Sequence, residues 1–150
     1  MAKAEKAIFV NMCMIRDGEK VLVIDRKKKD WPGVTFPGGH VEKEESFVDA
    51  IIREVYEETG LRITAPQLCG TKQFQTKEGA RYVVFFYKAT RFSGQLKSSS
   101  EGEVFWIDRK DLHTYPLAPD MMAMVEVMES EHLSEFYYYR ENGGWKYKLL

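Results

Sequence analysis

Three glutamates, Glu54, Glu57 and Glu58, stand close together in a segment whose apolar residues repeat with helical spacing. Positions three and four apart are neighbours on a helix, so the three carboxylates should gather on one face. They repel each other there, and the macrodipole disfavours negative charge toward a helix C-terminus. A cation is therefore expected to offset them. Clustered carboxylate oxygens suit a hard ion such as Mg²⁺ or Mn²⁺, and Mg²⁺ commonly completes its shell with waters and substrate phosphates.

The helix that must position these carboxylates is predicted over residues 46–59. At about 100° per residue, one stripe of it is apolar, formed by Phe47, Val48, Ile51, Ile52 and Val55. Gly60 follows, in the place where a glycine commonly ends a helix. The stripe should face the core and leave the glutamates on a neighbouring face, open to a ligand.

The remaining elements read as several strands and one further helix. Hydrophobic patterning predicts a second helix at 121–129 and strands at 7–15, 20–24, 34–36, 67–75, 81–90 and 103–107, with an exposed basic loop at 26–30. A closing hairpin is expected from 136–139 and 145–149 around the turn at 141–144. This mixture indicates an α/β domain whose helices cover a sheet.

Length and composition bound the class of protein. The chain of 150 residues is expected to form a single domain over 1–150. A net charge of −1 argues against a long nucleic acid as partner. Cys13 and Cys69 make no zinc spacing or disulfide framework and are expected to be reduced thiols of a cytoplasmic protein. No apolar run approaches the roughly 20 residues that span a bilayer, so no membrane partner is expected.

The glutamates belong to a longer pattern of fixed spacing. It comprises Gly39, Glu45, the pair Arg53-Glu54, Val55, the pair Glu57-Glu58 and Gly60-Leu61. With about 7–10% usage of each residue type, its seven polar and glycine identities would coincide by chance on the order of once in ten million windows. The pattern resembles the complete Nudix box, and it occupies residues 39–61.

The resemblance implies a fold and a set of roles. The fold would be an α/β/α sandwich with a mixed sheet, in which the box forms a loop–helix–loop. Glu54, Glu57, Glu58 and the carbonyl of Gly38 would bind Mg²⁺, with Mn²⁺ as the expected substitute. Arg53 would pair with the glutamates and orient them, and Glu45 would close the loop onto Arg53 or the helix. Gly39 and Gly60 would supply backbone freedom that side chains deny.

The identity of the general base stays open at this point. Members of the family differ in which carboxylate takes the proton from the attacking water. Glu54 is the first choice. A glutamate on a loop before a later strand is the other option, and both Glu101 and Glu103 stand just ahead of the strand at 103–107, with Glu103 preferred.

The surroundings of the box narrow the expected substrate. Residues 30–39, which end in Phe36-Pro37-Gly38-Gly39, resemble the MutT-like branch of the family, including the 8-oxo-dGTP diphosphatases. By that resemblance Arg26 would lie near the phosphates, Phe36 in the substrate site, and Asp120 at the purine edge. Asp120 also stands where it could instead cap the helix at 121–129, and one residue could serve both roles.

The predicted function is therefore hydrolysis of a nucleoside triphosphate, with 8-oxo-dGTP or another purine dNTP as the expected substrate, to the monophosphate and pyrophosphate. Such an enzyme would sanitise the nucleotide pool as a monomer or homodimer. The alternative substrates are other nucleoside diphosphates linked to a further group, such as nucleotide sugars and dinucleoside polyphosphates. A catalytically silent Nudix-fold binding module is a separate class, but such modules typically lose a box glutamate and none is lost here.

Overall fold

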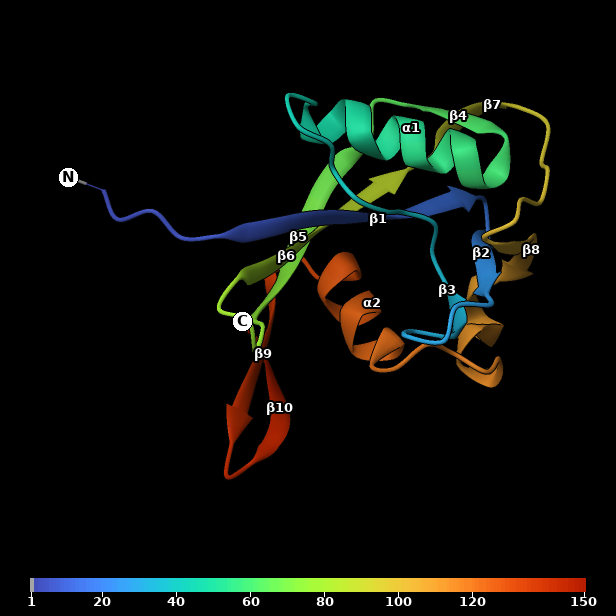
Figure 1. Ribbon diagram of the computed structural model, residues 1–150. Coiled ribbons are helices and arrows are strands. Elements are labelled where there is room, and N and C mark those ends of the chain that lie inside the picture. Colours follow the sequence, from blue (N-terminus) through green and yellow to red (C-terminus); the bar gives the residue numbers. More distant parts are fainter. Residues whose placement is uncertain (1) are drawn as a thin grey trace.

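The computed structural model describes residues 2–150, most of which form a curled, mixed sheet with one helix against each face (Figure 1). Its strand order is β10-β9-β5-β6-β1-β2-β3, and β8 pairs with β2 as a branch. The β1–β6 and β5–β9 pairs are parallel and the others antiparallel. The strands are β1 (Ala7–Asp17), β2 (Lys20–Arg26), β3 (Gly33–Thr35), β5 (Gln67–Gln75), β6 (Arg81–Ala89), β8 (Gly102–Asp108), β9 (Glu135–Glu141) and β10 (Gly144–Leu149).

Two separate hydrophobic clusters lie on the two faces of this sheet. Helix α1 (Phe47–Thr59) buries Ile51 and Val55 against Cys13, Ile15 and Tyr87. On the opposite face, helix α2 (Met121–Glu129) packs in a second cluster, with Met12, Met14, Val84, Phe86 and Phe136 from the strands. Alternate residues of a strand point to opposite faces, which is why one strand feeds both clusters. The predicted α/β/α sandwich is confirmed.

Helix α1 has the ends that its sequence predicts. The Oγ of Ser46 accepts a hydrogen bond from the amide of Asp49 at 2.9 Å, a regular N-cap. Gly60 ends the helix in the left-handed region at φ 79°, and its N–H donates to the carbonyl of Tyr56. Because L side chains are strained at that φ, glycine is the residue this position requires. The helix therefore presents its glutamates at a fixed height above the sheet.

Three short elements escaped prediction. Strands β4 (Leu61–Thr64) and β7 (Arg91–Gly94) pair only with each other, and η1 (Arg109–Thr114) is a 3-10 helix. Each is too short to show a periodic pattern in the sequence. The pairing of β4 with β7 also joins segments that lie far apart in the sequence. The closing hairpin was predicted correctly, with Asn142 and Gly143 at positive φ in its turn. No helix within residues 2–150 combines the length and apolar character needed to cross a bilayer.

Candidate active site

Arg53 is the centre of a charged network on α1. Its Nε and Nη2 donate to the two carboxylate oxygens of Glu45 at 2.7 and 2.9 Å, a bidentate pair that closes the preceding loop onto the helix. Its Nη1 donates to Glu54 at 2.9 Å and to Glu57 at 3.2 Å, and Nη2 also donates to the carbonyl of His40. The predicted contacts of Arg53 and Glu45 are confirmed. Five donors in a rigid fork make arginine suited to this task.

Glu58 is the buried member of the glutamate cluster, with only 5% of the residue exposed. Its Oε1 accepts a hydrogen bond from the amide of Gly38 at 2.7 Å. The pKa of Glu58 is raised to about 7, chiefly by burial and also by the negative charges of Glu54 and Glu101, although the Gly38 amide and Arg26 oppose the shift. Burial likewise raises the pKa of Glu54, against the hydrogen bond from Arg53. The positive charge that the protein places around Glu54 and Glu58 is therefore not enough to offset the burial of their carboxylates.

The Pro37–Gly39 turn passes so close to its neighbours that side chains are excluded. A Cβ on Gly39 would lie 2.4 Å from the carboxylate of Glu54, and one on Gly38 would lie 2.1 Å from the carbonyl oxygen of Asn11. Gly38 is thus needed for space beside the β1 backbone, whereas a side chain on Gly39 would displace only the end of the Glu54 side chain. Gly60 is needed both for its positive φ and because a Cβ there would lie 2.4 Å from the carbonyl oxygen of Gln95. The carbonyls of Pro37 and Gly39 accept hydrogen bonds from β1, and the intervening Gly38 faces Glu58 with its N–H.

Asn11 on β1 is a site residue that the motif did not reveal. It is 3% exposed, and its Oδ1 accepts a hydrogen bond from the amide of Gly39 at 2.9 Å. Its backbone N–H also donates to the carbonyl of Gly39 at 2.8 Å. Two bonds from one residue therefore fix the turn that carries the Gly38 carbonyl. The only sequence signal was a polar residue inside an apolar strand.

The residues of this cluster fit a divalent ion in their chemistry. Within residues 2–150 no three carboxylates are already gathered around one point, because Arg53 holds Glu54 and Glu57. The available donors are carboxylate oxygens and the Gly38 carbonyl, which are the ligands that Mg²⁺ prefers. Glu58, buried and in no ion pair with the described residues, is the carboxylate whose charge most needs a cation.

The two loop glutamates are placed differently from the expectation. Glu103 is exposed on β8 opposite Asp25, and no contact joins it to the cluster among the described residues. Glu101 is half-buried, pairs with Lys28 at 2.8 Å, and lies near enough to Glu58 to raise its pKa. Gly102 separates the two and cannot carry a side chain, since a Cβ would meet the carbonyl of Asp25 at 2.2 Å. The preference for Glu103 over Glu101 is therefore corrected.

One predicted substrate contact also needs correction. Phe36, the residue after β3, is 2% exposed, and its side chain belongs to the core beneath α2. Asp120 occupies the N-cap position of α2 in the left-handed region at φ 61°, and its side chain makes no capping hydrogen bond. The carboxylate of Asp120 consequently accepts no capping hydrogen bond from α2. Arg26 ends β2 close enough to Glu58 to lower its pKa, so it lies at the glutamate end of the site.

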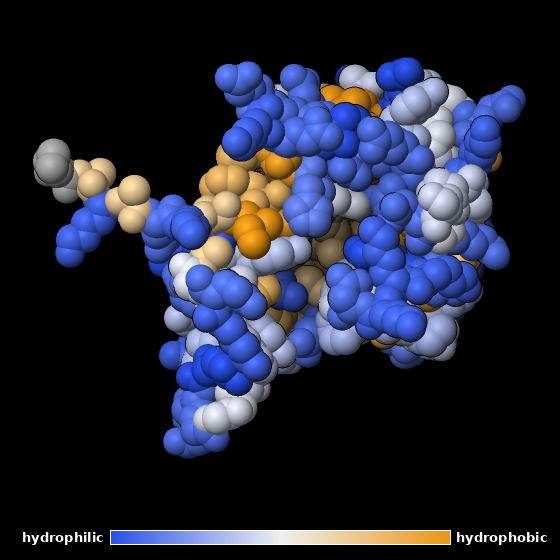
Figure 2. Space-filling model, in the orientation of Figure 1, coloured by the Kyte–Doolittle hydropathy of each residue, from blue (hydrophilic) through white to orange (hydrophobic). Residues whose placement is uncertain are grey.

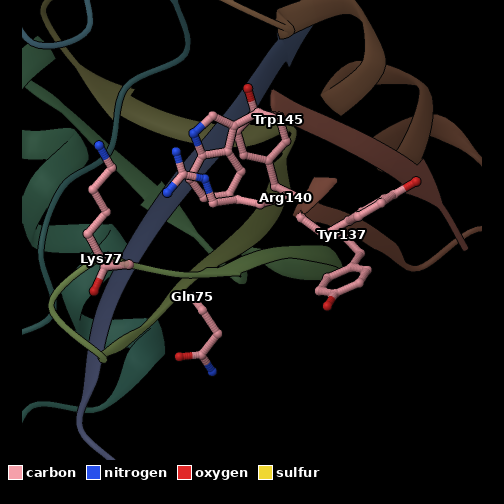
Figure 3. A pocket seen from close by; sticks show the side chains of 8 residues that line it. Gln75, Lys77, Tyr137, Arg140 and Trp145 are labelled. Atoms are coloured by element: carbon pink, nitrogen blue, oxygen red, sulfur yellow. The ribbon is translucent and has the colours of Figure 1, made fainter. Parts of the chain in front are cut away.

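Two surface hollows lie away from this cluster. One of about 340 Å³ is lined by the β5–β6 turn and the β9–β10 hairpin, with Gln75, Lys77, Tyr137, Arg140 and Trp145 around it (Figure 3). The other, of about 650 Å³, includes Arg16, Lys88, Arg91 and Glu129 in its lining. Neither contains a box residue, so neither marks the reaction centre.

Comparison with known proteins identifies the class of this site. Residues 6–128 match the model of the NUDIX domain. The chain is 36% identical to the uncharacterized Nudix hydrolase YvcI of Bacillus subtilis over 115 residues, 73% of this chain and 72% of that protein. It is 29% identical to the CTP pyrophosphohydrolase of Escherichia coli over 112 residues (74% and 82% of the two chains). With the mouse 8-oxo-dGDP phosphatase NUDT18 it shares 30% over 127 residues, 81% of this chain but 36% of that protein.

A solved structure gives the same assignment. The crystal structure of a MutT protein from Bacillus halodurans superimposes with a TM-score of 0.76 at 26% identity, covering 95% of this chain and 97% of that one. By their names, the two curated enzymes above act on different nucleotides, one on a pyrimidine and one on an oxidised purine. The family is thus common to all of them, while the base is not.

Proposed function

The chain belongs to the Nudix hydrolases, which act on phosphorus-containing anhydrides, and we propose that it is a Mg²⁺-dependent pyrophosphohydrolase of nucleoside triphosphates. The observation that carries the proposal is buried Glu58, held by the Gly38 amide and surrounded by Glu54 and Glu101 with Arg26 beside it. Carboxylates under mutual repulsion, next to a cation that can face phosphate, suit a metal–phosphate complex.

Glu54, Glu57, Glu58 and the Gly38 carbonyl are the groups that would hold the ion. Bound Mg²⁺ polarises a phosphoryl oxygen, neutralises developing charge and lowers the pKa of a water. The chain supplies the rest. Arg53 keeps Glu54 oriented through its 2.9 Å hydrogen bond, and Asn11 keeps the Gly38 turn in place through the Gly39 amide. Arg26 would bind a phosphate oxygen at the same end.

The general base is proposed to be Glu54, with Glu101 as the competing candidate. Glu54→Gln removes proton-accepting power without changing size, and a lost general base typically costs about 10²–10⁴ in kcat. Glu101→Gln is the paired test. Glu103→Gln, on an exposed carboxylate one glycine away, is the matched control and should leave kcat unchanged. If Glu101→Gln abolishes turnover while high Mg²⁺ restores Glu54→Gln, the base is Glu101 and Glu54 is a ligand.

The substrate is proposed to be a purine triphosphate, with 8-oxo-dGTP as the specific choice. Support comes from the MutT-like residues before the box, from the relative named as an 8-oxo-dGDP phosphatase, and from the Asp120 carboxylate, which makes no capping bond. A nucleotide panel should be assayed for kcat/KM with product analysis. Pyrophosphate with the monophosphate is expected. Orthophosphate as the product, or preference for a nucleotide sugar or dinucleoside polyphosphate, would reject the proposed reaction.

A further inference from the structure

Lys72 is the cation of this protein with the most aromatic surroundings. It lies in the middle of β5, and its Nζ is 5.2 Å from the ring centre of Phe136 and 5.5 Å from that of Tyr138. The rings of Trp31 and Phe74 lie at 5.9 Å each. We call these four residues the aromatic cage. They come from two strands, β5 and β9, and from the loop before β3, so the chain builds this enclosure from distant segments.

The ammonium inside the aromatic cage has no polar partner in the described part of the chain, residues 2–150. Lys72 enters no ion pair and no side-chain hydrogen bond there. Burial lowers its pKa, and the one charge that opposes this is Asp120. Cation–π attraction offsets part of the desolvation, but a methionine would fill the same space without that cost. The three N–H donors of Lys72 are consequently available to a ligand.

The aromatic cage is joined to the glutamate end of the site through Trp31. The Arg26 guanidinium lies 5.8 Å from the Trp31 ring and Lys72 lies 5.9 Å from it. Arg26 in turn acts electrostatically on Glu58. In Figure 2 the surface is hollowed in front of α2, between the β9–β10 hairpin and the segment around β3. A ligand with its phosphates near Arg26 would extend past Trp31 to Lys72.

Asp120 supplies an acceptor at the same end of this path. Its carboxylate lies near enough to act on both Lys72 and Tyr138. The left-handed backbone at φ 61° leaves that carboxylate without a capping bond to α2. An ammonium only donates hydrogen bonds and an ionised carboxylate only accepts them. The part of the site near the aromatic cage therefore offers one donor group, the Lys72 ammonium, and one acceptor group, the Asp120 carboxylate.

We propose that Lys72 is a specificity-determining residue whose ammonium donates to the O6 oxygen of a guanine base while Asp120 accepts from the opposite side of the same edge. This rests on the proposed function, because it places the phosphates at Arg26. Guanine presents the O6 acceptor beside the N1 and N2 donors, so it satisfies the ammonium and both carboxylate oxygens together. Adenine carries an amino donor where guanine carries O6. The 8-oxo form keeps O6, so the contact serves either form.

The test measures binding of nucleoside monophosphates by calorimetry in chelator, so that it depends on neither the metal nor turnover. The ligands are dGMP, the deoxynucleotide of 2-aminopurine, which lacks both O6 and the N1 hydrogen, and dCMP. Wild type should bind dGMP about 10–100-fold more tightly than the 2-aminopurine nucleotide. Lys72→Met should weaken dGMP binding, remove the part of that advantage that O6 contributes, and leave the 2-aminopurine nucleotide unaffected. Lys88→Met, on the neighbouring strand β6, is the control and should change neither affinity.

Each outcome decides the matter. Unchanged dGMP affinity in Lys72→Met overturns the proposal, and so does an equal loss for both purines, which would make Lys72 structural. Wild type that prefers dCMP, or that binds no purine monophosphate, overturns the assignment to O6. Melting of the variant checks its fold, and its Tm should be unchanged or raised because a buried charge is lost. Failure to hydrolyse triphosphates would reject the proposed function while leaving this binding result intact.

Discussion

Replacing Arg53 with methionine should cost the protein both stability and activity. The guanidinium is 25% exposed and holds Glu45 and Glu54, whose side chains are 15% and 16% exposed, at 2.7–2.9 Å. Removing it leaves two part-buried carboxylates without a cationic partner, and Glu45 keeps only the hydrogen bond from the Glu42 amide. The loop that ends at Glu45 and the orientation of Glu54 would be released together, because one side chain makes both sets of contacts.

The magnitude follows from these contacts. Charge-assisted hydrogen bonds contribute about 1.5–3 kcal/mol each, and breaking a buried ion pair from one side costs about 3–5 kcal/mol. The Glu57 contact adds little, since that side chain is 56% exposed. A loss of about 3–5 kcal/mol is expected, and a chain of this size loses about 2–4 °C of Tm per kcal/mol. The Tm should therefore fall by about 6–20 °C, with kcat falling in parallel.

Urea titration and calorimetry of the variants test this reasoning. Arg53→Lys keeps one charge but cannot engage Glu45 bidentately while reaching Glu54, so it should recover less than half of the lost stability. Arg109→Met breaks a comparable bidentate pair with Glu129, at 2.7 and 2.6 Å outside the box, and should lower Tm without changing kcat. The reasoning is refuted if Arg53→Met loses kcat while its Tm stays within 2 °C, roughly the scatter expected for a surface change.

Three further outcomes are expected. Chelation should abolish turnover and Mg²⁺ should restore it and raise Tm, an increase that Glu57→Gln should weaken if Glu57 is a ligand. Asp120→Ala should lower kcat/KM for the preferred purine nucleotide about 10–100-fold with no loss of Tm, because the side chain makes no capping bond; a lowered Tm with equal losses for all nucleotides would contradict it. Arg109 lowers the pKa of Glu129 from 4.5, so their pair stabilises above that pH, and the Tm gap between wild type and Arg109→Met should close as pH falls from 7 to 3.

The sequence predicted local features well because each has a local cause. Helix α1, its glycine stop and the Arg53–Glu45 pairing all follow from residues within one short segment. The bounds of β5 and α2 were also correct, since both carry long uninterrupted patterns. These positions are set by periodicity and spacing, which can be read without knowing which strands become neighbours.

The errors in the site concern contacts made across the sheet. Phe36 was expected at the substrate because of its neighbours in sequence, but its side chain lies in the hydrophobic core beneath α2. Glu101 and Glu103 lie on either side of Gly102. The pairing of β8 with β2 determines which of their side chains lies near Glu58, and that pairing is not visible in the sequence. Lys72 belongs to no sequence motif, so its role could not be predicted from the sequence. Its surroundings depend on the parallel β5–β9 pairing that brings Phe136 beside it.

The arrangement of charge in the site follows from how the sheet is built. β2 ends with Arg26 near the buried glutamate of α1, while β5 carries Lys72 toward the start of α2. The ring centre of Trp31 lies 5.8 Å from the Arg26 guanidinium and 5.9 Å from the Lys72 ammonium. If Arg26 binds phosphate and Lys72 meets the base, as proposed, this one ring contacts both ends of the nucleotide site. Under that proposal, a substitution at Lys72 would change discrimination between bases without disturbing the box glutamates, which fits a family whose members share chemistry but not substrate.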